Sequence, residues 1–451
     1  MLAARWPFTV TRCPLKILHC ADIHLGYETH GRLDPATGLN TRLLDFRRCF
    51  DALVERAVAE RVDLFLFCGD AYRTADPTPT QQKQFAEAMR PVAEAGIPVV
   101  MIVGNHDHPV TFGKASSVDI FGVLGGAGRA GRSRVEVFAQ PTFCAPGRDH
   151  GPIETLAGPL QLVALPWPIR SKILARDEHR AKTPHEVRAF IETFYVDFVR
   201  ACAADIDPTM PAVVAAHLTV QGAELGGSER ASLIAHEPTF TAAQLTPRGP
   251  DGRSAFDYVA LGHIHRYQDR NREAVERGDG PPVVYSSSIE RISFKEHDDR
   301  KGFVIVEIDS PAGAAGKTTR YTFVDTPARR FVPITADATG TADPTAAVLA
   351  EIARHDVADA VVRVRYTVDE NQHVDAGAVR EALAAADTVA AIEREAPPVV
   401  RRQRTVVGRD TSIRDAVERY VDQHETLAGM KDALVAAALD LDDALDQRVA
   451  E

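Results

Sequence analysis

Five apolar runs, each long enough for one β-strand, end in side chains that can bind a metal ion. They lie between residues 15 and 262 and alternate with amphipathic stretches of helical spacing. Strands that alternate with helices predict a layered α/β fold, in which functional groups gather beyond the carboxyl ends of the strands. The side chains that follow the five runs are, in chain order, Asp22 and His24, Asp70, Asn105 with His106 and Asp107, His217, and His263 with His265.

The chemistry of these side chains favours a pair of divalent ions. A carboxylate can bridge two cations, and a mixture of carboxylates, an amide and imidazoles suits Mn²⁺, Fe²⁺ or Zn²⁺ better than Ca²⁺ or Mg²⁺. Two ions roughly 3.5–4 Å apart can hold a phosphate and lower the pKa of a water between them. The expected reaction is therefore hydrolysis of a phosphoester. Each motif alone fits ordinary turn chemistry, so the prediction rests on their order, each after an apolar run.

These segments resemble the calcineurin-like metallophosphoesterase superfamily and, within it, the SbcD family of bacterial nuclease subunits. The resemblance rests on ADIHLG, CGDAY, VGNHDHP, AAHLTVQGAE, ALGHIHRYQ and YSSSIERISFKEHDDRKGFVIVEI. It implies a layered β-sandwich flanked by helices, with a small α+β capping domain and a C-terminal helical tail. It also implies a Mn²⁺-dependent nuclease, a double-strand 3′–5′ exonuclease and single-strand or hairpin endonuclease, that acts on DNA with an SbcC-type ABC ATPase in repair and recombination.

The resemblance also implies two sets of metal ligands that share Asp70. The first ion would be held by Asp22, His24, Asp70 and His265. The second ion would be held by Asp70, Asn105, His217 and His263. His106 would approach the scissile phosphate, where it would stabilise charge or protonate the leaving oxygen, unless it only orients Asn105. Asp107 is expected to be a structural hydrogen-bonding partner rather than a ligand.

One position departs from the family pattern. Relatives usually carry His or Asp three residues after the bridging aspartate, and here that position is Arg73. Arginine binds phosphate bidentately and cannot act as a base, so a proton-transfer role at this position is in doubt. We expect Arg73 either to bind a substrate phosphate or to form a surface salt bridge.

The sequence pattern changes after the predicted core. Residues 15–328 are predicted to form the nuclease core, and residues 329–405 a capping and DNA-binding domain of alternating helices and strands. Arg401, Arg402 and Arg404 are interpreted as a solvated linker that could also contact DNA phosphate. A small substrate would need neither a cap nor a tail, which argues against the alternative of a small-molecule phosphodiesterase or phosphatase. A binding scaffold with a dead site is disfavoured by the full ligand set.

The tail, residues 409–451, carries two apolar stripes at helical spacing, from Ile413 to Leu427 and from Met430 to Leu445. Such stripes usually pack on their own chain. We favour binding to the partner ATPase, because the tail follows a linker and its net charge of −6 disfavours DNA. The resemblance also allows a homodimer.

Net charge and cysteine content bear on the substrate and on the cellular location. The chain has a net charge of −11, of which more than half lies in the tail, so the charge does not decide the substrate. Six scattered cysteines without a C-x-x-C pair indicate reduced thiols and a cytoplasmic location. The first fourteen residues lack the apolar region of a secretory signal, and no apolar run approaches the roughly 20 residues of a membrane span.

Overall fold

The computed structural model describes residues 14–109, 113–125, 134–170, 182–227, 237–309, 317–395, 412–422 and 425–449. The predicted linker with Arg401, Arg402 and Arg404 lies outside these residues. None of the helices within them is long and apolar enough to cross a membrane. The cytoplasmic location stays a prediction.

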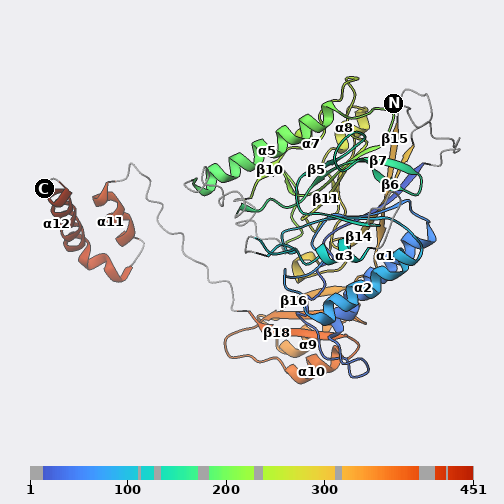
Figure 1. Ribbon diagram of the computed structural model, residues 1–451. Helices are drawn as coiled ribbons and strands as arrows, with labels where there is room; N and C mark the ends of the chain where they lie inside the picture. Colours follow the sequence, from blue (N-terminus) through green and yellow to red (C-terminus); the bar gives the residue numbers. More distant parts are fainter. Residues whose placement is uncertain are drawn as a thin grey trace, which may run out of the picture.

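Two β-sheets form the centre of the molecule (Figure 1). The first has the strand order β15 (Thr318–Asp325), β14 (Gly302–Asp309), β1 (Leu15–Cys20), β2 (Leu64–Phe67), β3 (Val99–Ile102) and β4 (Val135–Phe138). The second has the order β12 (Gln268–Asp269), β13 (Val283–Tyr285), β11 (Tyr258–Gly262), β8 (Ala212–His217), β7 (Gly158–Leu165) and β5 (Thr142–Cys144), with β6 (Ile153–Thr155) beside β7. Strands β1 to β4 are parallel, as are β7, β8, β11 and β13.

Helices cover the outer faces of both sheets. Helices α1 (Thr41–Ala59), α2 (Pro79–Glu94) and α3 (Asp119–Leu124) pack on the first sheet, and α5 (Pro184–Ala204) and α7 (Ala242–Leu245) pack on the second. The short helix α8 (Arg272–Arg277) follows β12, and the 3-10 turn η3 (Phe294–Glu296) follows β13. Two short strands, β9 (Thr219–Val220) and β10 (Thr239–Phe240), pair with each other. The longer helices α2 and α5 begin alike, because Thr78 and Thr183 form capping boxes and proline follows each of them.

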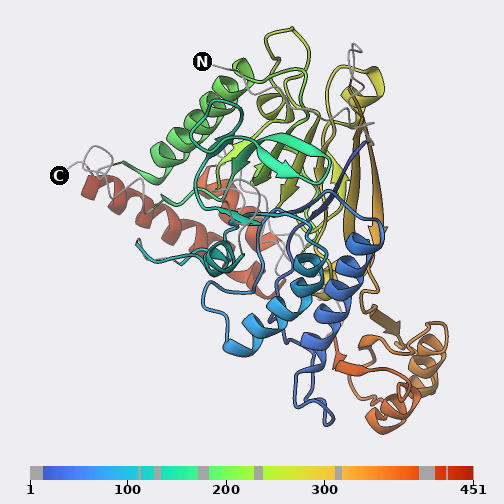
Figure 2. The same ribbon diagram turned by 45° about the vertical axis from the view of Figure 1, so that its right-hand side comes forward.

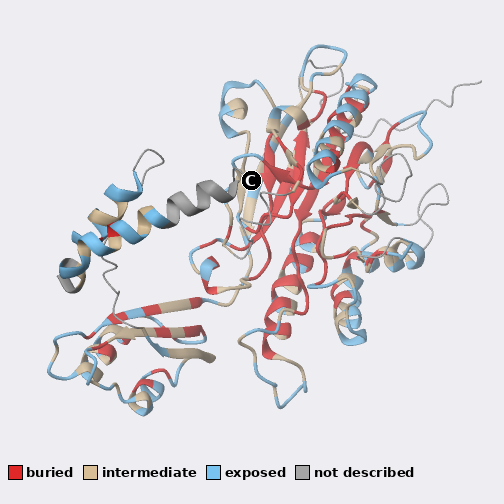
Figure 3. Cartoon of the chain, turned by 90° about the vertical axis from the view of Figure 1, so that its left-hand side faces the viewer, coloured by how far each residue is buried: buried red, intermediate tan, exposed pale blue. Residues whose placement is uncertain are grey.

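Successive side chains of β1 point to opposite faces of the first sheet and so contribute to two different layers of the core. Ile17 packs between the sheets in the same buried cluster as Val213 of β8. Leu18 points to the opposite face and packs with Phe46 of α1. A third cluster lies under α5 on the outer face of the second sheet, and Figure 3 shows the buried strands enclosed by half-buried helices. Two facing sheets flanked by helices confirm the predicted α/β class.

Several observed strands, among them β4 and β16 (Phe331–Asp337), were not predicted. Strand β2 ends at Phe67, although its apolar run continues to Cys68, because the chain turns at Gly69, where φ is 95°. Strand β15 was not predicted, because its polar residues alternate with aromatic ones and leave no apolar run. The turn predicted at 310–318 lies largely outside the described residues.

A smaller sheet follows the core (Figure 2). It contains β16 (Phe331–Asp337), β17 (Val361–Thr367) and β18 (Thr388–Arg394), all parallel, with α9 (Pro344–Ile352) and α10 (Ala376–Ala382) on one face. The tail contains α11 (Ile413–Asp422), the 3-10 turn η4 (Glu425–Met430) and α12 (Lys431–Val449). Helices α11 and α12 contact each other, and Val421 and Val435 are buried.

Arg329 joins the smaller sheet to the core. Its Nε donates to Asp45 Oδ2 at 2.6 Å, and its backbone N–H donates to Glu290 Oε2 at 2.9 Å. Both carboxylates are buried. Two residues later, the Phe331 ring packs edge-on against Phe294 of η3, with centroids 5.0 Å apart. The predicted boundary at 328/329 adjoins this arginine, and the division into functional domains stays a prediction.

Candidate metal centre

The seven predicted metal ligands lie together at the ends of five strands, β1, β2, β3, β8 and β11. The sequence placed each of them after a strand, whereas His217 is the last residue of β8. Asp22, His24, Asp70 and His263 have φ values of 53°, 50°, 63° and 99°. Non-glycine residues adopt such conformations at a cost of roughly 1–3 kcal/mol each, and they persist where the surrounding structure holds them. Strain of this kind is concentrated at functional sites.

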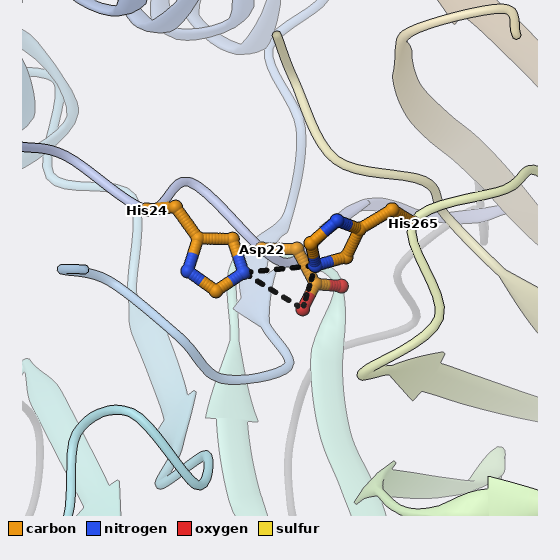
Figure 4. Close-up of side chains that lie close together, drawn as sticks. All are labelled: Asp22, His24 and His265. Atoms are coloured by element: carbon orange, nitrogen blue, oxygen red, sulfur yellow. Dashed lines mark hydrogen bonds and ion pairs between the residues drawn. The ribbon is translucent and has the colours of Figure 1, made fainter. Parts of the chain in front are cut away.

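The first set of donors is Asp22, His24 and His265 (Figure 4). The Nε2 atoms of the two histidines are 2.9 Å apart, and Asp22 Oδ1 lies 3.7 Å from His24 Nε2 and 3.9 Å from His265 Nε2. Donors that bind one ion at about 2.0–2.2 Å are separated from one another by about 3–4 Å, depending on the angle between the bonds. The three atoms therefore suit a shared cation, and all three side chains are buried.

Asp70 lies between this set and a second one. Its Oδ2 is 3.6 Å from His24 Nε2 and 3.5 Å from His217 Nε2. On the second side, Asn105 Oδ1 is 2.9 Å from His217 Nε2 and 3.1 Å from His263 Nδ1. The structure thus brings all seven predicted ligands into two neighbouring sets that share Asp70. Their role as ligands stays a prediction.

The hydrogen bonds of the second set fit a bound cation. His217 Nδ1 lies 2.7 Å from the Cys68 carbonyl oxygen, to which it donates, and His263 Nε2 lies 2.9 Å from Glu237 Oε2. With those nitrogens protonated, two neutral rings direct lone pairs at Asn105 Oδ1, itself an acceptor. A cation between the three atoms satisfies all of them.

The pKa of His217 also indicates that the site favours positive charge. Burial favours its neutral form, but the carboxylates of Asp70 and Asp22 outweigh burial and raise the pKa of His217 to about 9. The donor set therefore attracts a cation, either a proton or a metal ion.

Asp107 organises the turns that carry the ligands. Its Oδ2 accepts the backbone N–H of Asp70 at 2.8 Å and of Gly104 at 2.9 Å, and its Oδ1 accepts that of Ala71 at 2.9 Å. The contacts agree with the structural role expected for Asp107. Gly104 is required by packing, because a Cβ there would lie 2.1 Å from Asp70 Oδ1.

His106 lies at the edge of the first set. Its ring packs edge-on against His24, with centroids 4.9 Å apart, and its Nδ1 is 2.7 Å from the Arg73 carbonyl oxygen. Its backbone N–H donates to Asp70 Oδ1 at 2.8 Å. The exposed guanidinium of Arg73 lies 5.0 Å from the Tyr27 ring centroid. Within the described residues Arg73 forms no ion pair, so the salt bridge offered as one alternative for it is not seen.

Some of the residues that contact the ligands were not predicted. Glu237 and Glu296 bond to His263 and His265, and the Trp167 ring lies beside His263 with centroids 4.8 Å apart. Glu296 lies in the segment SFKEHDD, which carried part of the family resemblance. No sequence signal marks Glu237 or Trp167, because their roles arise from contacts between distant segments.

Comparison with known proteins assigns the chain to a phosphoesterase family. Residues 15–267, more than half of the chain, match the family model described as calcineurin-like phosphoesterase. The chain is similar to the SbcD subunit of the SbcCD nuclease of Bacillus subtilis (strain 168), with 26% identity over 287 residues, 61% of this chain and 63% of that protein. It is similar to the corresponding SbcCD protein of Escherichia coli (strain K12), with 26% identity over 257 residues, 56% of this chain and 57% of that protein.

The matched region is less than two thirds of the length of these curated relatives. Among solved structures, a dimetal phosphatase from Danio rerio is 10% identical, and the match covers 68% of this chain and 99% of that chain with a TM-score of 0.35.

Substitution of Gly104 tests the packing around Asp70. We expect Gly104→Ala to lower the affinity for Mn²⁺ by at least about 10-fold, because displacement of Asp70 misplaces the atom shared by both sets. Overpacking should also cost about 1–3 kcal/mol of unfolding free energy. Calorimetric titration with Mn²⁺ measures the first effect, with Gly429→Ala as control, since a Cβ at Gly429 meets nothing within 4 Å. Wild-type Mn²⁺ affinity in Gly104→Ala would contradict this account.

Proposed function

Because the chain belongs to the calcineurin-like phosphoesterase family, we propose that it is a Mn²⁺-dependent DNA nuclease subunit. It would trim double-stranded ends from 3′ to 5′ and cut single strands or hairpins, together with an SbcC-type ATPase in repair and recombination. The observation that carries the proposal is the pair of donor sets sharing Asp70, with His106 at their edge. The names of the relatives, both nuclease subunits, support a nucleic acid as the substrate.

The seven ligands would divide as the sequence predicts. Asp22, His24 and His265 would hold the first ion, and Asn105, His217 and His263 the second, with Asp70 touching both. When bound, two such ions polarise a phosphoester and lower the pKa of an attacking water. The protein's part is to fix these donors in a buried, strained cluster.

His106 would contribute a proton. Its Nδ1 donates to the Arg73 carbonyl oxygen, so in the neutral ring Nε2 carries only a lone pair. We propose that the ring acts in its protonated form, with Nε2–H directed at the phosphate or the leaving oxygen. The bond to Arg73 would hold the ring in place during this transfer.

Two cationic side chains that form no ion pair within the described residues support a nucleic-acid substrate. Arg73 is one of them. Arg363 of β17 lies on the same sheet face as Val361, which packs with Phe294 of η3, and its guanidinium is 4.3 Å from the Phe294 ring centroid. Among the described residues Arg363 has no ion pair. We propose that both arginines contact DNA phosphates.

The direct test is cleavage of labelled hairpin and blunt duplex DNA with Mn²⁺ or Mg²⁺, beside bis-p-nitrophenyl phosphate. We expect Mn²⁺-dependent cutting of DNA. Hydrolysis of the small diester with no DNA cleavage, even with the ATPase present, would favour a small-molecule phosphodiesterase.

The role of His106 can be separated from metal binding. We expect His106→Ala to retain two Mn²⁺ per chain by elemental analysis and to lose DNA cleavage by at least about 100-fold. His150→Ala is the matched control, since His150 pairs with Glu136 at 3.1 Å and is not among the proposed site residues. A parallel loss of metal and activity would move His106 into the ligand set.

Arg363 and Arg365 provide a matched test of DNA binding, with Arg365 as the control. Arg365 is already paired with Glu393 and Glu395, both at 3.3 Å, whereas Arg363 has no such partner among the described residues. We expect Arg363→Ala to weaken binding of duplex DNA and to reduce the salt dependence by about one phosphate contact, with Arg365→Ala nearly silent. Fluorescence anisotropy across a salt series measures both, and equal effects would remove Arg363 from the interface.

We propose that the tail binds the ATPase. The tail residues Ile413, Tyr420 and Met430 are 39%, 51% and 54% exposed, and a partner could cover this apolar surface. Such a helical surface fits a groove or coiled coil of a partner. The predicted homodimer is independent of this contact and stays a prediction.

Removal of the tail tests this assignment. Truncation after Arg409 should leave hydrolysis of the small diester nearly intact, because all proposed ligands precede residue 266. It should abolish co-purification with an SbcC-type ATPase and ATP-stimulated cutting of duplex DNA. A truncated chain that still binds the ATPase would place the interface on the core or the cap.

A further inference from the structure

We propose that Glu237 and Glu296 are positioning residues, each of which orients one histidine ligand and thereby sets the affinity for one of the two ions. The inference rests on the proposed metal centre. Both glutamates lie outside the ligand motifs, and each contacts the ring nitrogen that faces away from the donor cluster. A carboxylate in that position fixes the tautomer of a metal-binding imidazole and increases its basicity.

Glu296 acts on the first ion. Its Oε1 lies 3.2 Å from His265 Nδ1, and the Nε2 of the same ring faces His24 Nε2 at 2.9 Å. The contact requires Nδ1 to be the protonated nitrogen and leaves the lone pair of Nε2 directed at the first donor set. His265 is thereby held in the one tautomer that can bind a cation there.

A buried lysine holds Glu296 in place. Lys301 Nζ lies 3.1 Å from Glu296 Oε2 and donates to the carbonyl oxygen of His265 at 3.1 Å. The lysine thus fixes both the backbone of His265 and the carboxylate that orients its ring. Glu296 and Lys301 are fully buried, so neither can exchange its partner for water without a large cost.

Glu237 acts on the second ion. Its Oε2 lies 2.9 Å from His263 Nε2 and accepts the Thr219 hydroxyl at 3.0 Å, while His263 Nδ1 faces Asn105 Oδ1 at 3.1 Å. His263 therefore presents the opposite ring nitrogen to the cluster from the one that His265 presents. Each tautomer is set by its own glutamate.

The contacts that hold Glu296 and Glu237 in place differ in strength. Glu296 is shielded from solvent and neutralised by Lys301, whereas the Glu237 side chain is 17% exposed and is held by the Thr219 hydroxyl and the histidine itself. Water competes with the Glu237 contact more readily. The proposal therefore assigns the tighter site to the first ion and the more exchangeable site to the second.

The test measures metal binding directly. We expect the wild-type chain to bind two Mn²⁺ by calorimetric titration and to show the spin-coupled spectrum of a Mn²⁺ pair by electron paramagnetic resonance. Glu237→Ala should weaken one site by roughly 10–100-fold and yield the spectrum of an isolated Mn²⁺ at low metal concentration. Glu237→Gln should weaken it less, since its amide oxygen can still accept from His263.

Double-mutant cycles separate positioning from a general structural effect. If Glu237 acts through His263, Glu237→Ala should have no further effect on Mn²⁺ affinity in a His263→Ala background. The same holds for Glu296→Gln with His265→Ala. Because Glu296→Gln removes the closer of the two carboxylates that pair with Lys301, the double variant with Lys301→Met is used if the single variant unfolds.

Glu290→Gln is the matched control, since Glu290 is buried in the same segment and hydrogen-bonds Arg329 rather than a ligand. Its Mn²⁺ affinity should equal that of the wild type. Two tight Mn²⁺ in both glutamate variants would overturn the inference and leave the metal centre standing. Fewer than two Mn²⁺ in the wild type would overturn the metal centre itself.

Discussion

The buried carboxylate of Asp70 is the contact on which the rest of the site depends. One oxygen lies between His24 and His217, which come from different sheets, and the other accepts the backbone N–H of His106. A buried negative charge is costly unless it is paired and hydrogen-bonded. The buried carboxylate between the two sheets must therefore be balanced by positive charge. The neighbouring histidines supply that charge without a metal ion only when they are protonated.

The turns around Asp70 show how the fold maintains this arrangement. Asp107 gathers three backbone N–H groups from two separate strand ends, and Gly104 leaves room for the Asp70 carboxylate. The strained conformations at Asp22, His24 and His263 are offset by the packed layers beneath them. The apolar core and the polar edge thus form one unit, since removal of either leaves the other unsupported.

The sequence predicted the parts of this structure that local patterns specify. The ligand motifs were found because each closely follows or ends an apolar strand. Strands such as β15, with alternating polar residues, leave no comparable run. Strand β2 is also shorter than its apolar run, because the chain turns at Gly69.

Contacts between distant segments lay beyond prediction. The sequence could not show that Glu237 meets His263, or that Lys301 supports Glu296, because no short pattern specifies such a pairing. Nor could it decide between the two roles offered for Arg73, which is seen over Tyr27 without an ion pair among the described residues. The sequence also could not show where Arg363 lies, because its proximity to Phe294 depends on how the smaller sheet joins the core.

The central claim, that Asp70 joins two metal ions, is tested most directly by anomalous diffraction at the manganese edge from crystals grown with Mn²⁺. The account predicts two anomalous peaks on either side of Asp70 Oδ2. One should lie against Asp22, His24 and His265, and the other against Asn105, His217 and His263. A single peak, or two peaks of which only one contacts Asp70, would contradict it.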